Sequence, residues 1–260
     1  WGGEPLSKVM NMEILGNEPI AKEVYKMELR ARELDFKEMM PGCFLNISVG
    51  SGTELLLRRP ISIFEADEEN ATLSIIYKVL GKGTKNLSLM KPGEMLDVLG
   101  PLGTGFPIQD EAMKVLLVGG GVGVPPLYEL GKRLVGKGIK VETVLGFRDE
   151  ESIFCEEDFR KLGPLYITTE DGSYGTRGYV TDVIKEKEID FDTLYACGPK
   201  LMLKSLDETY KDTKKGFLSF EERMACGIGA CYGCMTETKE GLRRVCKDGP
   251  VFGLGEVRYE

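Results

Sequence analysis

The feature that most constrains the fold of this chain is a change in its hydrophobic pattern near Lys114. Before this point, short β-type runs alternate with turns rich in Gly, Pro and Asn. Examples of these runs are FLNISV (44–49), PISIF (60–64), ATLSIIYKV (71–79) and EMLDVL (94–99). Many short strands at fairly regular spacing are typical of an antiparallel barrel. We therefore predict an N-terminal antiparallel β-barrel over residues 1–107.

After Lys114 the sequence alternates strands with helices. Apolar runs predict strands at 115–118, 141–145, 165–168 and 194–196. Apolar residues at helical spacing predict helices over 126–135, 180–188 and 200–210. This alternation is typical of a doubly wound parallel sheet. We predict a nucleotide-binding α/β domain over 108–214 and a small C-terminal iron–sulfur domain over 215–260, with no regular elements after Lys215. The fold class is thus multidomain, β followed by α/β.

Four of the seven cysteines lie close together near the C-terminus, in a C-x4-C-x2-C-x11-C pattern. Zinc sites with four thiolates usually show two close C-x2-C pairs, whereas here one close pair is flanked by single cysteines. The spacing is nearer to the plant-type iron–sulfur pattern, and the intervening glycines let main-chain N–H groups approach the sulfur atoms. We predict a [2Fe–2S] cluster, with a zinc site and a disulfide as alternatives, on Cys226, Cys231, Cys234 and Cys246.

A second set of residues has the chemistry of a site for a phosphate and an aromatic ring. In RPIS (59–62), the arginine can pair with a phosphate and the serine hydroxyl can donate to a ring nitrogen. The run IYK (76–78) precedes GKGT (81–84), whose glycines leave main-chain N–H groups free to approach a pyrophosphate. On these residues alone, a strand beside an arginine held in an ordinary ion pair remains an alternative.

The segment VLLVGGGVGVPP (115–126) places a glycine-rich turn between a buried strand and a helix. Such a turn can bind a phosphate at the helix N-terminus, and it can also be only a tight connection. Its spacing is Gly121-x-Gly123-x-x-Pro126. Proline suits the first turn of a helix, where its missing N–H costs nothing. We therefore take this turn as a candidate nucleotide site.

Two later segments should face the same crevice, because each follows a predicted strand. They are GFR (146–148) and CGP (197–199). In the second segment, Cys197 is either close to a bound nicotinamide or a small buried residue, since free cysteine packs like a hydrophobe. The acidic run DEE (149–151) would repel a ribose 2′-phosphate. We therefore predict a preference for NAD over NADP.

Composition excludes several functional classes. A net charge of −8 argues against a nucleic-acid surface, and no apolar stretch reaches the ~18 residues of a membrane span. The N-terminal residues lack a signal-peptide pattern. With an odd number of cysteines, a reducing compartment is favoured, so we expect a cytoplasmic protein. The chain has no histidine, the commonest general base. We expect cofactors to carry the chemistry, with no catalytic side chain in this chain.

The three sets of residues, in this order, resemble the ferredoxin–NADP reductase superfamily. There a flavin-binding barrel with an R-x-x-S/T motif precedes a nicotinamide domain with G-x-G-x-x-P and C-G-P. The segments RRPISI, GPLGTGFP, GGGVGVPPLYEL, DGSYGTRG and MACGIGACYGC are similar to the electron-transfer subunits of dihydroorotate dehydrogenase B within that superfamily. The resemblance covers nearly the whole chain. One departure from the wider superfamily is Ile61, where a stacking Tyr or Phe is common.

This resemblance implies the bound groups. FAD would be held by Arg59, Pro60, Ile61, Ser62, Ile76, Tyr77, Lys78, Gly83 and Thr84. NAD(H), as a co-substrate, would contact Gly121, Gly123, Pro126, Cys197 and Gly198. The four cysteines would ligate the [2Fe–2S] cluster, and the loop that carries them should lie next to both the flavin edge and a partner surface.

The resemblance also implies a partner and a reaction. The partner would be an FMN-containing catalytic subunit that oxidises dihydroorotate in pyrimidine synthesis, in a heterotetramer with two copies of each subunit. Two alternatives stay open. The chain would otherwise be a subunit of an electron-bifurcating NADH-dependent ferredoxin:NADP oxidoreductase or sulfide dehydrogenase, or a zinc-binding interaction module.

Overall fold

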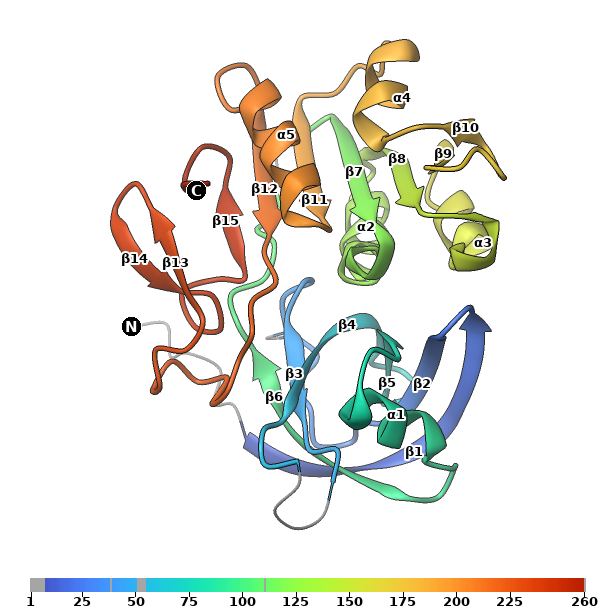
Figure 1. Ribbon diagram of the computed structural model, residues 1–260, viewed down its shortest axis with the longest axis vertical. Helices are drawn as coiled ribbons and strands as arrows, with labels where there is room; N and C mark the ends of the chain where they lie inside the picture. Colours follow the sequence, from blue (N-terminus) through green and yellow to red (C-terminus); the bar gives the residue numbers. More distant parts are fainter. Residues whose placement is uncertain (1–7, 38, 51–54, 110, 260) are drawn as a thin grey trace.

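The computed structural model describes residues 8–37, 39–50, 55–109 and 111–259. These residues form a β-barrel, a seven-stranded sheet with helices, and a small cysteine-rich region that lies beside both (Figure 1). No helix in these ranges is both long enough and apolar enough to cross a membrane. Residues 1–7, part of the segment that we searched for a signal peptide, lie outside the described ranges.

Six strands close the barrel in the order β1-β2-β5-β4-β3-β6, and all neighbouring pairs are antiparallel. They are β1 (Lys8–Ala21), β2 (Val24–Arg30), β3 (Phe44–Ile47), β4 (Arg59–Asp67), β5 (Thr72–Lys78) and β6 (Met95–Leu102). Along β6 buried residues alternate with more exposed ones, because every second side chain points into the barrel. Met27, Leu29 and Ile75 are among the residues that fill the interior. The predicted barrel is confirmed.

The second layer is a sheet in the order β10-β9-β8-β7-β11-β12-β15. All pairs are parallel except β12 with β15. Its strands are β7 (Lys114–Gly120), β8 (Lys140–Phe147), β9 (Leu165–Thr169), β10 (Thr176–Arg177), β11 (Thr193–Cys197), β12 (Lys215–Ser219) and β15 (Val251–Gly253). Strand β7 has β8 on one side and β11 on the other, so the strand order reverses beside β7. In parallel sheets, ligands bind at the carboxyl ends of strands at such a switch point.

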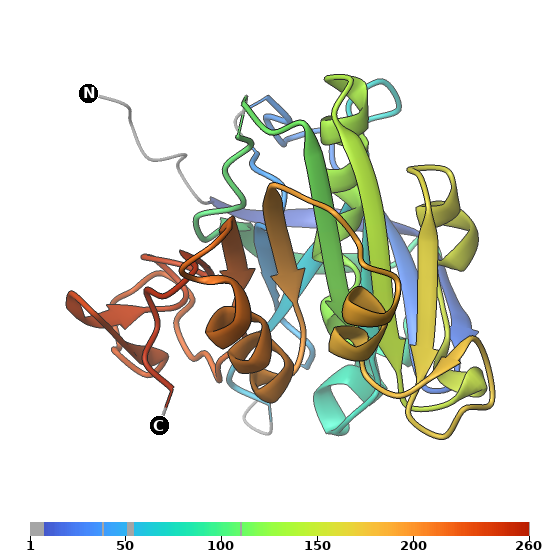
Figure 2. The same ribbon diagram turned by 90° about the horizontal axis from the view of Figure 1, so that it is seen from above.

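Helices cover both faces of this sheet, as Figure 2 shows. Val115 and Leu117 of β7 pack in one core with Leu127, whereas Leu116 and Val118 pack in the other with Val183. This alternation follows from the two-residue period of a strand, and it confirms the predicted doubly wound arrangement. The helices are α1 (Lys82–Leu89) beside the barrel, then η1 (Gly121–Gly123), α2 (Pro126–Gly136), η2 (Glu150–Ser152), α3 (Glu156–Arg160), α4 (Val180–Glu186) and α5 (Lys200–Tyr210).

The prediction that regular elements stop after Lys215 is wrong. Strands β12 and β15 extend the sheet, and β13 (Met235–Thr238) pairs with β14 (Gly241–Arg244) in a separate hairpin. Strand β12 is only five residues long and includes a glycine, so its register comes from pairing with β11 rather than from its own sequence. Two strands of the predicted iron–sulfur domain thus belong to the sheet, and the predicted boundaries remain predictions.

Strand β4 of the barrel packs directly on helix α2 of the sheet layer. The Phe64 and Tyr128 rings stack with centroids 4.6 Å apart. Next to them, Lys132 Nζ lies 2.8 Å from a Glu65 carboxylate oxygen, and the buried Glu129 accepts the main-chain N–H of Ala66 at 3.3 Å. This contact fixes the barrel against the sheet, so pockets built from both layers have a defined shape.

Candidate functional site

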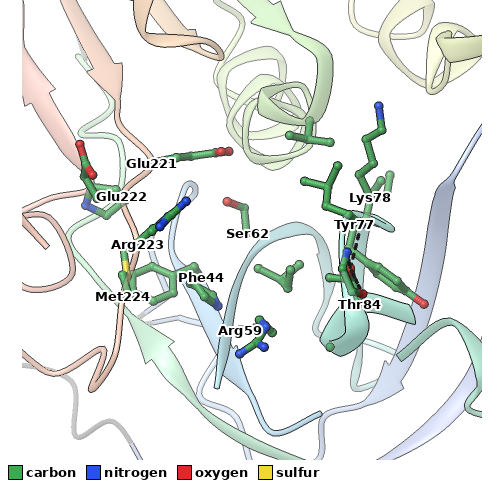
Figure 3. Close-up of a pocket in the computed structure, with 18 of the residues that line it drawn as sticks. Phe44, Arg59, Ser62, Tyr77, Lys78, Thr84, Glu221, Glu222, Arg223 and Met224 are labelled. Carbon is green, nitrogen blue, oxygen red and sulfur yellow. Dashed lines mark hydrogen bonds between the residues drawn. The ribbon is translucent and has the colours of Figure 1, made fainter. Parts of the chain in front are cut away.

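A pocket of about 590 Å³ opens between the barrel and the segment that follows β12. One wall comes from β4, β5 and the start of α1, and the opposite wall from residues 219–224 (Figure 3). All nine residues predicted for FAD line this pocket, namely Arg59, Pro60, Ile61, Ser62, Ile76, Tyr77, Lys78, Gly83 and Thr84. The structure therefore brings together residues from three separate motifs.

The Arg59 guanidinium lies against the first turn of α1. A β-carbon added to Gly83 would lie 2.6 Å from Arg59 Nε, so the glycine is what permits this approach. The first turn of α1 holds no acidic residue, and a helix N-terminus carries a partial positive charge. Together the guanidinium and the helix N-terminus form a cationic corner that suits a phosphate group.

Three of the nine side chains make hydrogen bonds within the protein. Arg59 Nη1 donates to the carbonyl oxygens of Leu57 and Arg58. The Thr84 hydroxyl accepts the main-chain N–H groups of Leu80 at 3.0 Å and Gly81 at 3.3 Å. The Tyr77 hydroxyl donates to Asn17 Oδ1 at 2.8 Å, and burial raises the pKa of Tyr77 well above its ordinary value. Thr84 therefore shapes the turn before α1, and Tyr77 anchors the barrel behind the pocket.

The residues of the opposite wall belong to none of the predicted FAD motifs. This wall consists of Ser219, Phe220, Glu221, Glu222, Arg223 and Met224, with Phe44, Val122 and Pro250 beside it. In Figure 3 the Glu221 carboxyl and the Ser62 hydroxyl point toward the same part of the pocket. The run 219–224 begins at the last residue of β12, so only the position of β12 beside β11 identifies it as part of the site.

A second pocket, of about 260 Å³, lies at the carboxyl ends of β7 and β11. The predicted residues Gly121, Gly123 and Gly198 line it, whereas Pro126 is buried in the first turn of α2. A β-carbon on Gly123 would lie 2.4 Å from the Cys197 carbonyl oxygen. The glycine turn therefore packs directly on the end of β11, at the switch point of the sheet.

Cys197 itself is in the core. Its exposed fraction is 1%, it is absent from the lining of both pockets, and burial raises the pKa of its thiol well above the ordinary value. The structure thus favours the buried alternative for this thiol, and a contact with nicotinamide stays a prediction.

The two pockets adjoin. Val122, Phe220, Glu221 and Glu222 line both of them. Glu221 is exposed to solvent but lines both pockets, and desolvation by the neighbouring protein raises the pKa of its carboxyl. A group bound in one pocket would therefore lie next to a group bound in the other.

The four clustered cysteines stand as two pairs. Cys226 contacts Cys231 through their side chains, and Cys234 contacts Cys246 in the same way. Main-chain N–H groups also point at sulfur, from Gly229 to Cys246 Sγ at 3.2 Å and from Cys246 to Cys234 Sγ at 3.4 Å. Within the described ranges, no three His, Cys, Asp or Glu side chains converge on a single metal position.

The two pairs differ in their electrostatics. Burial raises the pKa of Cys226, but the N–H groups of Ile228 and Cys231, the Cys231 side chain and the Ala230 N–H outweigh it and lower that pKa to about 6. Burial and the neighbouring Cys234 thiol raise the pKa of Cys246 to about 12. Donors that favour thiolate at Cys226 also suit ligation of a metal, because a thiolate is the ligand.

The cysteine loop continues directly from the wall of the first pocket. Arg223 and Met224 line that pocket, and Cys226 follows two residues later. The Cys226 carbonyl also accepts a hydrogen bond from Asn46 Nδ2 of the barrel at 3.4 Å. Two observations therefore support the predicted closeness of the cysteine loop to the pocket predicted for FAD. The loop follows the pocket wall directly in the sequence, and it is hydrogen-bonded to strand β3 of the barrel.

Comparison with known proteins agrees with this geometry. Residues 117–208 match the oxidoreductase NAD-binding domain, and residues 221–258 match the iron-sulfur cluster binding domain of dihydroorotate dehydrogenase B. The electron transfer subunit of dihydroorotate dehydrogenase B (NAD(+)) from Bacillus cereus strain G9842 is 48% identical over 254 residues, covering 95% of this chain and 97% of the relative. The corresponding protein of Bacillus anthracis strain CDC 684 matches to the same extent.

A solved structure of an NADH-dependent reduced ferredoxin-NADP oxidoreductase superposes with a TM-score of 0.86 at 32% identity. It covers 100% of this chain and 92% of the other. A ferredoxin-NADP+ reductase from Plasmodium falciparum shares the fold, with a TM-score of 0.63 at 16% identity over 79% of this chain and 90% of the other.

The barrel, the nucleotide sheet and the iron–sulfur domain together define a nicotinamide-linked iron–sulfur oxidoreductase chain. At 48% identity over nearly its whole length, the chain belongs to the family of dihydroorotate dehydrogenase B electron transfer subunits.

Proposed function

We propose that this chain passes electrons between NAD(H) and the FMN of a catalytic partner subunit, through an FAD and a [2Fe–2S] cluster that it binds. The observation that carries the proposal is continuity: the first pocket shares four residues with the second, and its wall runs directly into the cysteine loop. A nicotinamide exchanges two electrons as hydride, a cluster of this kind exchanges one at a time, and a flavin does both. A flavin site between the other two therefore fits the order of the sites.

The first pocket fits FAD by size and charge. Its volume of about 590 Å³ lies within the range of ligand pockets. Arg59 and the first turn of α1 would hold the phosphates. The Ser62 hydroxyl, directed into the pocket (Figure 3), would donate to the flavin ring. The apolar wall from Pro60 and Ile61 would cover the ring and exclude water.

The second pocket would receive NAD(H). The glycine turn after β7 and the start of η1 and α2 would approach the pyrophosphate, and Gly198 would lie near the nicotinamide. Beyond β8, Arg148 Nε is held by Asp149 at 2.9 Å. Because this ion pair engages the Arg148 guanidinium, the cation is less available to a ribose 2′-phosphate. The ion pair therefore supports a preference for NAD over NADP.

The cysteine pairs fit a [2Fe–2S] cluster. Such a cluster takes four protein ligands, two for each of its irons, and the loop supplies two pairs of thiols. The N–H groups of Gly229 and Cys246 that point at sulfur are the kind of donor that sets cluster potential.

The partner would dock beside this loop. Cys231 is exposed, and three apolar side chains near it in sequence or in the hairpin are exposed as well, Ile228, Tyr232 and Leu242. Tyrosine is enriched at protein interfaces, and neighbouring exposed apolar side chains are typical of interaction sites. We propose an FMN-containing dihydroorotate dehydrogenase subunit here, in a heterotetramer with two of each chain, and a cytoplasmic location for the complex.

A second candidate is a subunit of an electron-bifurcating enzyme, because the solved structure at 32% identity is described in that context. The identity of 48% to dihydroorotate dehydrogenase subunits favours the first candidate. Purification under low oxygen, with cofactor analysis of the chain and its bound partner, tests both. We expect one FAD, two irons and two sulfides per chain, with an FMN protein bound. A larger iron–sulfur flavoprotein would support the second candidate, and a colourless zinc protein would contradict both.

A further inference from the structure

Asn46 lies on β3 at the boundary between the barrel and the cysteine loop. Its side chain is fully buried, with an exposed fraction of 0%. Its Nδ2 atom donates to the Cys226 carbonyl oxygen at 3.4 Å. Its Oδ1 atom has no hydrogen-bond partner among the described residues. A buried amide that is only half satisfied costs free energy, so its presence in the barrel calls for an explanation.

The cysteine loop packs directly on the side-chain amide of Asn46. Gly227 follows Cys226 with φ at +74°, a backbone conformation that favours glycine. A β-carbon on Gly227 would lie 2.6 Å from Asn46 Nδ2. The loop therefore comes into van der Waals range of Asn46 only because residue 227 has no side chain.

On its β4 side, Asn46 adjoins residues of the flavin pocket. In the β3–β4 ladder Asn46 pairs with Pro60, and Phe44 pairs with Ser62. Phe44, Pro60 and Ser62 all line that pocket. Asn46 is thus a single residue that joins the strands behind the pocket to the peptide of the first cysteine ligand.

We propose that Asn46 is a positioning residue that fixes Cys226 relative to the flavin pocket, and so sets the distance and orientation for electron transfer between the two sites. The proposal rests on the proposed function. An apolar side chain would suit this buried position in the barrel, but it could not donate the hydrogen bond that holds the Cys226 carbonyl. Residues that orient the groups around a metal site typically affect activity by about 10–100-fold.

The test compares Asn46→Leu with Ser74→Ala. Ser74 is also a buried polar residue of the barrel, on β5, and no contact joins it to the cysteine loop among the interactions described. In the protein with both cofactors, we expect Asn46→Leu to slow electron transfer from flavin to cluster by about 10–100-fold and to change the EPR spectrum of the reduced cluster. Reduction of the flavin by NADH should be unchanged, and Ser74→Ala should change none of these.

A second readout needs no cluster. In the metal-free protein, hydrogen exchange of residues 226–231 should be faster in Asn46→Leu than in Ser74→Ala, because the loop has lost its anchor. If exchange and the flavin-to-cluster rate both match the parent protein, the proposal is wrong. It is equally wrong if Asn46→Leu lowers the melting temperature and the FAD content together, since that is a barrel defect.

A double-mutant cycle tests whether the effect of Gly227→Ala depends on the Asn46 side chain. Gly227→Ala carries the cost of a positive φ in any background, but its contact with Asn46 exists only when Asn46 is present. The flavin-to-cluster rate should therefore fall more for Gly227→Ala in the parent than in Asn46→Ala. Additive effects would overturn the proposal. If the parent protein itself lacks FAD or the cluster, the proposed function fails instead, which distinguishes the two failures.

Discussion

A β-carbon placed on Gly83 would lie 2.6 Å from Nε of Arg59, so the start of α1 and the arginine of β4 are in direct contact. This contact joins two motifs that are more than twenty residues apart in the sequence. It creates the cationic corner at which we place the FAD phosphates.

Replacing Gly83 with alanine should weaken FAD binding. The new methyl group would push the guanidinium away from the corner, and loss of a charged hydrogen bond costs about 1.5–3 kcal/mol, or roughly 10- to 150-fold in Kd. The control is Gly16→Ala on β1, because no atom lies near its β-carbon position and Gly16 is not among the residues that line the pocket. Titration of the deflavinated proteins with FAD measures the effect. Equal affinities for the two variants would contradict the assignment.

Replacing Gly123 with alanine should impair the nicotinamide site. Its β-carbon would lie 2.4 Å from the Cys197 carbonyl oxygen, and overpacking of this kind costs about 1–3 kcal/mol. We expect a lower melting temperature and a higher KM for NADH with FAD content retained. Gly136→Ala is the matched control at the end of α2, where the added carbon meets nothing, and it should behave like the parent. A normal KM in Gly123→Ala would count against this pocket.

Asp149→Asn should increase the use of NADPH relative to NADH. The substitution releases Arg148 from its ion pair but keeps an acceptor for Ser152, which now donates to Asp149 at 2.6 Å. Because exposed ion pairs are worth about 0.2–1 kcal/mol, the change should be at most roughly fivefold. Steady-state kinetics with both nucleotides check it. Glu151→Gln, at a carboxylate that pairs with Lys22 instead, should change the ratio less, because it leaves the ion pair between Arg148 and Asp149 intact.

The cluster-free protein should be alkylated first at Cys226. Because its pKa is lowered to about 6, this thiol is protonated below pH 6 and becomes the reactive thiolate as pH rises through that value. Cys246, with a pKa raised to about 12, should stay unmodified at pH 8. Iodoacetamide labelling from pH 5 to 9 with peptide mapping gives both profiles. A midpoint for Cys226 above pH 8 would show that the N–H groups do not stabilise its thiolate.

Most of the fold could be predicted from the sequence, because hydrophobic periodicity is a local signal. The run at 115–118 is apolar on both sides of the strand, and the structure buries both sides under helices. Strands β12 and β15 could not be predicted in this way. Each is short and takes its register from a neighbour far away in the sequence.

Part of the candidate site could likewise be predicted from local sequence patterns, and part could not. Residues from Arg59 to Thr84 stand in motifs and line one pocket. Glu221 and its neighbours complete the pocket only through the position of β12, so no local pattern marks them. Asn46 is a similar case, since an isolated asparagine on a strand carries no signal until the loop that packs on it is known.

The most direct test is to add NADH to the purified chain under low oxygen, without its partner, and to follow flavin absorbance and cluster EPR together. We predict that the flavin bleaches and that a signal from one reduced [2Fe–2S] cluster per chain then appears. The Cys234→Ser variant should bleach without that signal. A flavin that is fully reduced beside a cluster that stays oxidised would contradict the proposed passage of electrons through this chain.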